Sequence, residues 1–341
     1  MKANVRKTKQ IFGDYELKHS LDCDCEILGK EFDIHLGNVV GKLLFPKLSP
    51  VFIDCRINGK LDTENKTIPG PICPISGMIL GNEQDGFGKT KWGQTMSFPN
   101  GNSSVACVMV EFSMFEDNLE TDVQTVYDHI DAWFTRFYDI YEVLSMYPVR
   151  RKEKESPLFV QGYGFRNAGT LLFTRHPNNY LYNKNDTGAF FDVDFLTGRL
   201  KYEELTKIIR FTNEQKELSF DYRCFLEGLK AFFEEDYKKA ITVSSPALEA
   251  ALLSGIKKFA VSKNIYFLDK LLKKYRMLGG YFALANDIDM ELPTSDYKKS
   301  LLDLRNDVVH NGYAPTKEET DKYLKDVRKY LDTFSGSLLS C

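Results

Sequence analysis

The periodicity of the apolar residues changes near residue 215 of this 341-residue chain, so one regular architecture cannot accommodate all of it. Before that point, segments such as 32–45 and 103–115 alternate or are rich in valine, and Gly, Pro and Asn residues separate them. Short apolar segments bounded by turn residues are typical of β-strands. Beyond it, apolar residues recur every three or four positions, which indicates amphipathic helices. The sequence therefore predicts an α+β protein, with a β-rich domain over 1–212 and a helical domain over 213–341.

One amphipathic helix is expected inside the β-rich domain, over about 121–147. Its aromatic and aliphatic residues share one helical face, and Pro148 follows its end. Such a stripe is more typical of a buried core than of a ligand site, and His129 is expected at its flank. A shorter helix is expected over 202–211. The loop 81–94 has four glycines but not the spacing of a phosphate-binding loop, so we interpret it as a hairpin or surface loop.

The helical domain is predicted to be an antiparallel bundle. Its expected helices cover 218–241, 246–262, 265–280, 295–312 and 316–334. Ser245–Pro246 fits an N-cap followed by proline at the first helical position, and Gly279–Gly280 fits a helix end. Thr316 and Glu319 have the spacing of a capping box, which indicates the start of the last helix.

Composition excludes several classes of protein. The formal charge of −3 and the isoelectric point near 6.0 argue against a surface that is basic throughout. No apolar stretch has the length of a membrane helix, and no signal peptide is recognisable, so we expect a cytoplasmic protein without membrane contact. The seven cysteines form no disulfide framework, and Cys23 and Cys25 lack a second pair at zinc spacing. We therefore expect neither a metal nor a cofactor.

The residues with the clearest chemistry lie in the segment 304–313, LRNDVVHNGY. On a helix, Asn306 and His310 are neighbours at the edge of an apolar face. Arg305 lies about 140° around the axis from His310, so its side chain must reach across or the helix must end there. An imidazole exchanges protons near neutral pH, and a guanidinium grips a phosphate through paired hydrogen bonds. Together they suffice for phosphodiester cleavage by the 2′-hydroxyl of RNA.

The bare spacing also fits a structural interpretation. A histidine at a helix end interacts favourably with the helix dipole, and an exposed arginine forms surface ion pairs. Spacing alone favours this interpretation, because a chain with this composition contains an arginine with a histidine five residues later by chance about one time in five.

The context of the motif changes this balance. Residues from about 215 to 341 resemble the HEPN superfamily, helical-bundle nucleases and nucleotide-binding domains, of the Apea-like or abortive-infection type. The HEPN motif is an arginine, a polar residue, usually three further residues and a histidine, before a last helix. Here it reads R-N-D-V-V-H, with Arg305, Asn306 and His310 in these places.

The resemblance implies a metal-independent endoribonuclease. His310 would transfer the proton of the 2′-hydroxyl, Arg305 would bind the scissile phosphate, and Asn306 would orient the histidine or the ribose. Cleavage would leave a 2′,3′-cyclic phosphate or its hydrolysed form. Active HEPN domains dimerise so that two motifs share one cleft. Many also have an acidic residue on an earlier helix, for which Glu234, Glu235 and Glu249 all qualify.

A basic segment agrees with an RNA partner. Residues 257–276 contain seven basic residues against one acidic residue, Asp269. Tyr266 and Tyr275 are candidates for stacking on unpaired bases. A solvated pair of helix faces is the equal alternative. The candidate RNA-binding residues are Lys257, Lys258, Lys270, Lys273, Lys274 and Arg276.

Two hypotheses follow. The first is a ribonuclease with a regulatory N-terminal domain that senses a trigger ligand or a phage protein, by analogy with bacterial anti-phage and toxin proteins. The second is a non-catalytic HEPN module that binds a nucleotide, an RNA or a partner protein.

Overall fold

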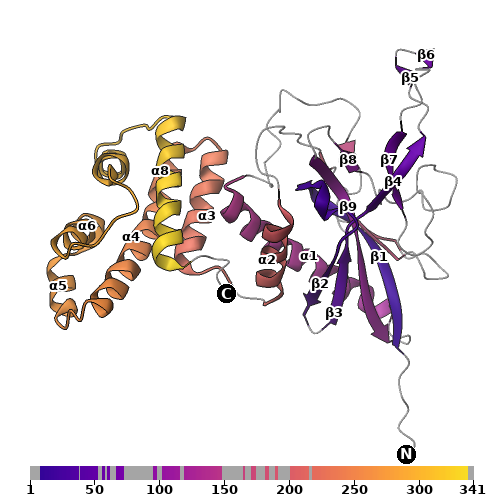
Figure 1. Cartoon of the computed structure of the whole chain (residues 1–341), viewed down its shortest axis with the longest axis horizontal. Coiled ribbons are helices and arrows are strands. Elements are labelled where there is room, and N and C mark those ends of the chain that lie inside the picture. The colour runs from indigo at the N-terminus through magenta and orange to yellow at the C-terminus, as the bar shows by residue number, and fades with distance from the viewer. Residues whose placement is uncertain are drawn as a thin grey trace, which may run out of the picture. The chain divides into compact units, whose positions relative to one another are not determined.

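The computed structural model divides into two compact units (Figure 1). The first comprises Met1–Tyr138 and Glu153–Gln215, and the second comprises Asp139–Lys152 and Lys216–Cys341. The structure describes residues 8–37, 39–52, 56–57, 60–61, 67–72, 95–97, 102–115, 119–147, 164–165, 170–173, 181–183, 189–190, 200–214 and 217–336. The predicted loop 81–94 lies outside these residues.

The first unit contains an antiparallel sheet. Within the described residues, seven strands form it in the order β12–β11–β1–β9–β3–β2, and β8 also pairs with β9. Three pairs, β4–β7, β5–β6 and β10–β13, form separate two-stranded sheets. The strands are β1 (Thr8–Asp24), β2 (Glu31–Leu36), β3 (Val39–Leu44), β4 (Lys47–Phe52), β5 (Arg56–Ile57), β6 (Lys60–Leu61), β7 (Thr67–Ile72), β8 (Thr95–Ser97), β9 (Asn102–Phe115), β10 (Gly164–Phe165), β11 (Thr170–Phe173), β12 (Leu181–Asn183) and β13 (Ala189–Phe190).

The strands predicted over 32–45 and 103–115 are confirmed as β2, β3 and β9. In β2, buried and exposed residues alternate, as a strand with one face in the core requires. The turn between β2 and β3 contains Gly37 at φ +62°, a conformation that glycine adopts without strain. The long pair β1–β9 changes register between Glu16 and Leu21, which marks a bulge.

The described part of the first unit also contains the 3-10 helix η1 (Cys25–Ile27), α2 (Tyr202–Asn213) and the part of α1 (Leu119–Ser145) up to Tyr138, and both α-helices were predicted. Trp133 and Phe134 are buried, and Phe134 stacks on Tyr15 of β1 with 4.9 Å between ring centroids. The Trp133 indole N–H donates to Asn213 Oδ1 at 3.0 Å, and Asn213 Nδ2 donates to the Asp33 carbonyl at 2.8 Å. The aromatic stripe of α1 is therefore core, as its spacing indicates.

The second unit is helical, so the class is α+β. Helices α3, α4 and α8 pack against one another (Figure 1). Residues of α1 from Asp139 onward group with this unit, and the predicted boundary at 212–213 falls at the end of α2. The helices are α3 (Phe220–Phe233), α4 (Tyr237–Ser262), α5 (Leu268–Lys274), α6 (Met277–Asp287), the π-helical η4 (Lys298–Asp303), α7 (Leu304–His310), α8 (Lys317–Tyr330) and the π-helical η5 (Leu331–Ser335).

The helix start predicted at Ser245–Pro246 is wrong, because α4 runs through both residues. The chain turns earlier, where Glu235 has a φ of 61° and Asp236 caps α4 by accepting the Lys239 N–H at 3.0 Å. A proline inside a helix costs about 3 kcal/mol. Burial of the residues that follow Pro246 on α4 offsets this cost, since Ala247, Leu248, Ala251 and Leu252 are fully buried.

The helix end predicted at Gly279–Gly280 is also wrong, because both glycines lie inside α6. The break falls at Tyr275–Arg276 instead. A Cβ atom at residue 280 would lie 3.0 Å from the Tyr275 carbonyl carbon. Gly280 therefore permits the close return of α6 past the end of α5, and it does not terminate a helix.

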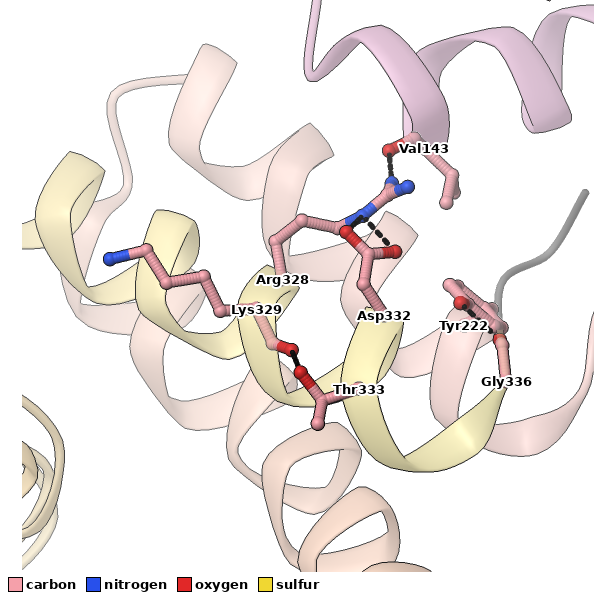
Figure 2. A network of polar contacts seen from close by, with 7 residues as sticks. All are labelled: Val143, Tyr222, Arg328, Lys329, Asp332, Thr333 and Gly336. Carbon is pink, nitrogen blue, oxygen red and sulfur yellow. Dashed lines mark hydrogen bonds and ion pairs between the residues drawn. The ribbon is translucent and has the colours of Figure 1, made fainter. Parts of the chain in front are cut away.

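The last helix agrees with its prediction. Thr316 Oγ1 accepts from the Glu319 N–H and Glu319 Oε2 accepts from the Thr316 N–H, which is the expected capping box. At the other end of α8, Arg328 donates to the Val143 carbonyl in the last turn of α1 and to Asp332 (Figure 2). Arg328 therefore supplies a donor to a helix end that lacks intrahelical partners.

Alanine substitutions at two glycines are expected to change the free energy of unfolding in opposite directions. A Cβ at Gly228 of α3 would lie 2.6 Å from Ser244 Cβ on α4, whereas a Cβ at Gly279 would lie 3.6 Å from Leu302 Cδ1. We expect Gly228→Ala to lower the free energy of unfolding by about 1–3 kcal/mol because the helices must separate. We expect Gly279→Ala to raise it by up to about 1 kcal/mol through helix propensity. Urea unfolding of both variants measures this, and equal effects would contradict it.

Candidate active site

The segment LRNDVVH forms α7, which continues from the π-helical turn η4. Leu301 and Val308 are fully buried and fix this helix in the bundle. The helix ends at His310, since the N–H groups of Asn311 and Tyr313 both donate to the Asp307 carbonyl at 3.0 Å. Gly312 follows with a φ of 69°. The helix end expected at Gly312 is therefore confirmed.

The structure brings the three predicted motif residues together. Arg305 Nη1 lies 3.2 Å from His310 Nε2 and donates to Asn306 Oδ1 at 3.0 Å. The arginine reaches around the helix to the histidine, which is one of the two alternatives that its angular offset left open. Asn306 is half-buried and contacts the arginine, whereas His310 is exposed. One guanidinium nitrogen therefore links all three side chains.

The chemistry of this contact restricts the tautomer of the histidine with which a hydrogen bond can form. A guanidinium has N–H donors and no acceptor, so the Arg305–His310 contact is a hydrogen bond only if His310 Nε2 has a free lone pair. The imidazole is then neutral, with its proton on Nδ1. Protonation of Nε2 would place two donors face to face and break the bond. The contact thus couples the position of Arg305 to the charge of His310.

The charge of Arg305 has no counterion in the described part of the chain. None of the ion pairs formed there includes Arg305, and its Nε is buried without a hydrogen-bond partner. Of the acidic candidates, Glu234 caps the end of α3, Glu235 lies in the following turn and Glu249 is half-buried on α4. Among the described residues, none of these three carboxylates bonds to Arg305. A half-buried guanidinium with spare donors is suited to an external anion.

Two buried hydroxyl groups, one of which feels the charge of Arg305, were not identified from the sequence. Tyr323 of α8 is fully buried, and its hydroxyl lies 3.0 Å from Ser245 Oγ of α4. Burial raises the pKa of Tyr323 to about 12, although the bond to Ser245 and the charge of Arg305 act in the opposite direction. The hydroxyl is therefore neutral at physiological pH. No local signal marks this pair, because its members are 78 residues apart and Ser245 before Pro246 has the pattern of an N-cap.

The predicted RNA-binding residues do not contact the motif. Lys257 and Lys258 lie on α4, Lys270, Lys273 and Lys274 lie on α5, and Arg276 lies in the turn before α6. No hydrogen bond joins any of these side chains to the motif residues within the described part of the chain. Lys258 Nζ instead donates to the Phe334 carbonyl at 2.5 Å, so this lysine caps the end of η5.

Other expectations concern metal and membrane binding. Within the described ranges, no three or more His, Cys, Asp or Glu side chains are grouped so that they could hold a metal ion. His129 is half-buried on α1, with its ring close to Gly37. In the same part of the chain, no helix has the length and apolar character needed to cross a membrane.

Comparison of the chain with models of known families, with curated proteins and with solved structures finds no match.

Proposed function

We propose that this protein is a metal-independent endoribonuclease of the HEPN type and that Arg305, Asn306 and His310 are its active site. The observation that carries the proposal is the 3.2 Å contact between Arg305 Nη1 and His310 Nε2. It joins a proton-transfer group to a guanidinium that has no carboxylate partner among the described residues. A phosphate diester supplies the missing negative charge, and its neighbouring 2′-hydroxyl supplies the proton.

The reaction follows from these groups. Arg305 binds the scissile phosphate, which draws the guanidinium away from His310 and frees the Nε2 lone pair. Nε2 accepts the proton of the 2′-hydroxyl, the 2′-oxygen attacks phosphorus, and the bond to the 5′-oxygen breaks with its electron pair on that oxygen. A general acid then protonates the 5′-oxygen. In a dimer, the protonated histidine of a second protomer fills this role. The products are a 2′,3′-cyclic phosphate and a 5′-hydroxyl.

The resting position of Arg305 predicts the tautomer of His310. At a pH where His310 is neutral, we expect its Nε2 to be unprotonated and its Nδ1 to hold the proton, because Arg305 donates to Nε2. In Arg305→Ala we expect the proton to move substantially to Nε2. Nitrogen-15 chemical shifts of the imidazole distinguish these states. Arg223→Ala, which removes an exposed ion pair with Glu217, is the control. A wild-type protein with its proton on Nε2 would show that the contact does not exist in solution.

The same contact supports a second candidate function. Because Arg305 occupies the lone pair of His310, a ligand that binds the guanidinium without displacing it would be held but not cleaved. The protein would then be a non-catalytic module that binds a nucleotide, an RNA or a partner protein.

One experiment separates the two functions. A labelled unstructured RNA is incubated with the wild-type protein in excess EDTA, and both binding and strand length are followed. The ribonuclease proposal predicts shorter products, and the binding proposal predicts a stable complex with intact RNA. Sedimentation velocity at micromolar concentration tests the dimer, which a strict monomer would contradict. For a bacterial defence or toxin role, we expect induced expression to arrest growth in wild type but not in His310→Ala.

A further inference from the structure

The segment from the end of α4 to the start of α6 lies entirely at the surface. No residue from 261 to 277 is buried, and α5 contributes none to the core. Leucines 268, 271 and 272 of α5 are half-buried and attach this helix to the bundle. Large apolar side chains nevertheless face solvent in the segments that precede and follow α5. They are Val261, Tyr266, Phe267 and Met277, which are 78%, 91%, 58% and 68% exposed.

The basic residues of this region have no acidic partners. None of the seven between 257 and 276 forms an ion pair with a described residue, and neither does Asp269. On α8 the pattern is different, since Lys322, Lys325, Arg328 and Lys329 each pair with an aspartate. The region around α5 therefore has a concentrated positive charge without ion pairs among the described residues, and Asp287 is linked to Lys274 only through the Tyr275 hydroxyl.

Only some of the aromatic rings in this region are available to stack on a ligand. Tyr275 donates its hydroxyl to Asp287, and the Lys274 ammonium lies 4.9 Å from the centre of its ring. Tyr275 is therefore engaged, which argues against the stacking role considered for it. Tyr266 and Phe267 lie next to each other in the turn before α5, and no ring contact to either is present within the described residues. These two aromatic residues are consecutive in the chain, and both side chains are exposed.

We propose that Tyr266, Phe267 and the basic residues of α5 form a binding surface for unpaired RNA. This α5 surface combines the two parts that sequence-tolerant single-strand binding requires, namely cations for the phosphates and aromatic faces for the bases. Duplex RNA hides the faces of its bases within the stack, so it satisfies only the first part. The inference rests on the proposed function and specifies its substrate as single-stranded.

Charge and geometry disfavour other occupants. A second copy of this surface would bring two uncompensated basic regions together, which is repulsive. A membrane would require an apolar helical face to insert, but the half-buried leucines of α5 already pack on the bundle, and a seven-residue helix is only about 10 Å long. A polyanion with exposed rings of its own fits both the charge and the aromatic pair.

The test measures binding in a His310→Ala background, so that cleavage does not consume the ligand. The probes are a fluorescent unstructured RNA, the same sequence as a duplex, and vesicles with anionic lipid. We expect the added Tyr266→Ala/Phe267→Ala pair to weaken single-strand binding about tenfold or more and duplex binding little. Changing Lys270, Lys273 and Lys274 to Gln should flatten the dependence of log affinity on log salt by about 2 for single strands. Changing Lys322 and Lys325 of α8 to Gln is the matched control.

Unchanged single-strand affinity in the aromatic variant would overturn the inference, as would equal losses for single-stranded and duplex RNA. Binding of the vesicles but not of the single strand would overturn it too. These outcomes are separable from failure of the proposed function. If the α5 surface binds single strands but wild-type protein cuts none, the inference stands without the ribonuclease. If wild-type protein cuts RNA and the aromatic variant binds unchanged, only the inference fails.

Discussion

Replacing His310 by alanine is expected to lower the rate of RNA cleavage by about 10²–10⁴-fold, the usual contribution of a positioned general acid or base. The expected cause is loss of the only group of the motif that can accept the proton of the 2′-hydroxyl. Initial rates on an unstructured RNA in EDTA measure the effect. The fold should persist, because His310 is exposed at the end of α7 while Val308 holds that helix in the core.

The matched control is His35→Ala. His35 is also an exposed histidine, but it lies on β2 in the first unit, where its backbone N–H donates to Asn213 Oδ1 and its side chain has no hydrogen bond within the described residues. We expect this variant to cleave RNA at the wild-type rate. Equal rates for wild type and His310→Ala would remove the motif from the reaction. Equal losses in both variants would show that the effect is not specific to the site.

The largest expected effect on stability is that of Trp133→Ala in the first unit. Truncating a buried tryptophan or phenylalanine costs about 3–5 kcal/mol, because burial is lost and a cavity remains. Here the change also removes the indole N–H that donates to Asn213 Oδ1, and Asn213 in turn accepts the His35 N–H at 2.9 Å. We expect the first unit to unfold at a lower temperature, as calorimetry or hydrogen exchange of β2 would detect.

Trp133→Phe separates the two contributions. It keeps most of the ring that stacks on Phe137 and removes only the donor to Asn213. The net worth of such a hydrogen bond is about 1 kcal/mol, so this variant should lie much closer to wild type. Similar stabilities of the alanine and phenylalanine variants would contradict the role of the ring as core.

The elements that were predictable have local causes. The period of the apolar residues identifies α1 and α2, and the capping box of Thr316 and Glu319 fixes the start of α8. Each of these signals lies within a few residues of the structure that it determines. The errors came from equally local signals that packing overrides. Pro246 did not begin a helix because α4 is buried on both sides of it, and Gly280 did not end one because it contacts the end of α5.

In the candidate site too, local features were predictable from the sequence, whereas contacts set by packing were not. The order of Arg305, Asn306 and His310 is visible in the sequence, but the direction of the arginine side chain is not, since the spacing allowed two outcomes. Contacts between distant residues were also hidden. Lys258 resembled its neighbours as an RNA-binding lysine until its bond to the Phe334 carbonyl was seen. The hydroxyl pair of Tyr323 and Ser245 requires two helices whose packing no short pattern describes.

The most direct test of the ribonuclease proposal is the chemistry of the RNA ends. A defined RNA is incubated with wild-type protein in EDTA, and the fragments are analysed by mass spectrometry. We predict a 2′,3′-cyclic phosphate, or its hydrolysed form, on one fragment and a 5′-hydroxyl on the other, because the 2′-oxygen is the nucleophile. We also predict no cleavage at a position where the ribose is replaced by 2′-deoxyribose. Fragments with 3′-hydroxyl and 5′-phosphate ends, or cleavage at the deoxyribose, would contradict the proposed reaction.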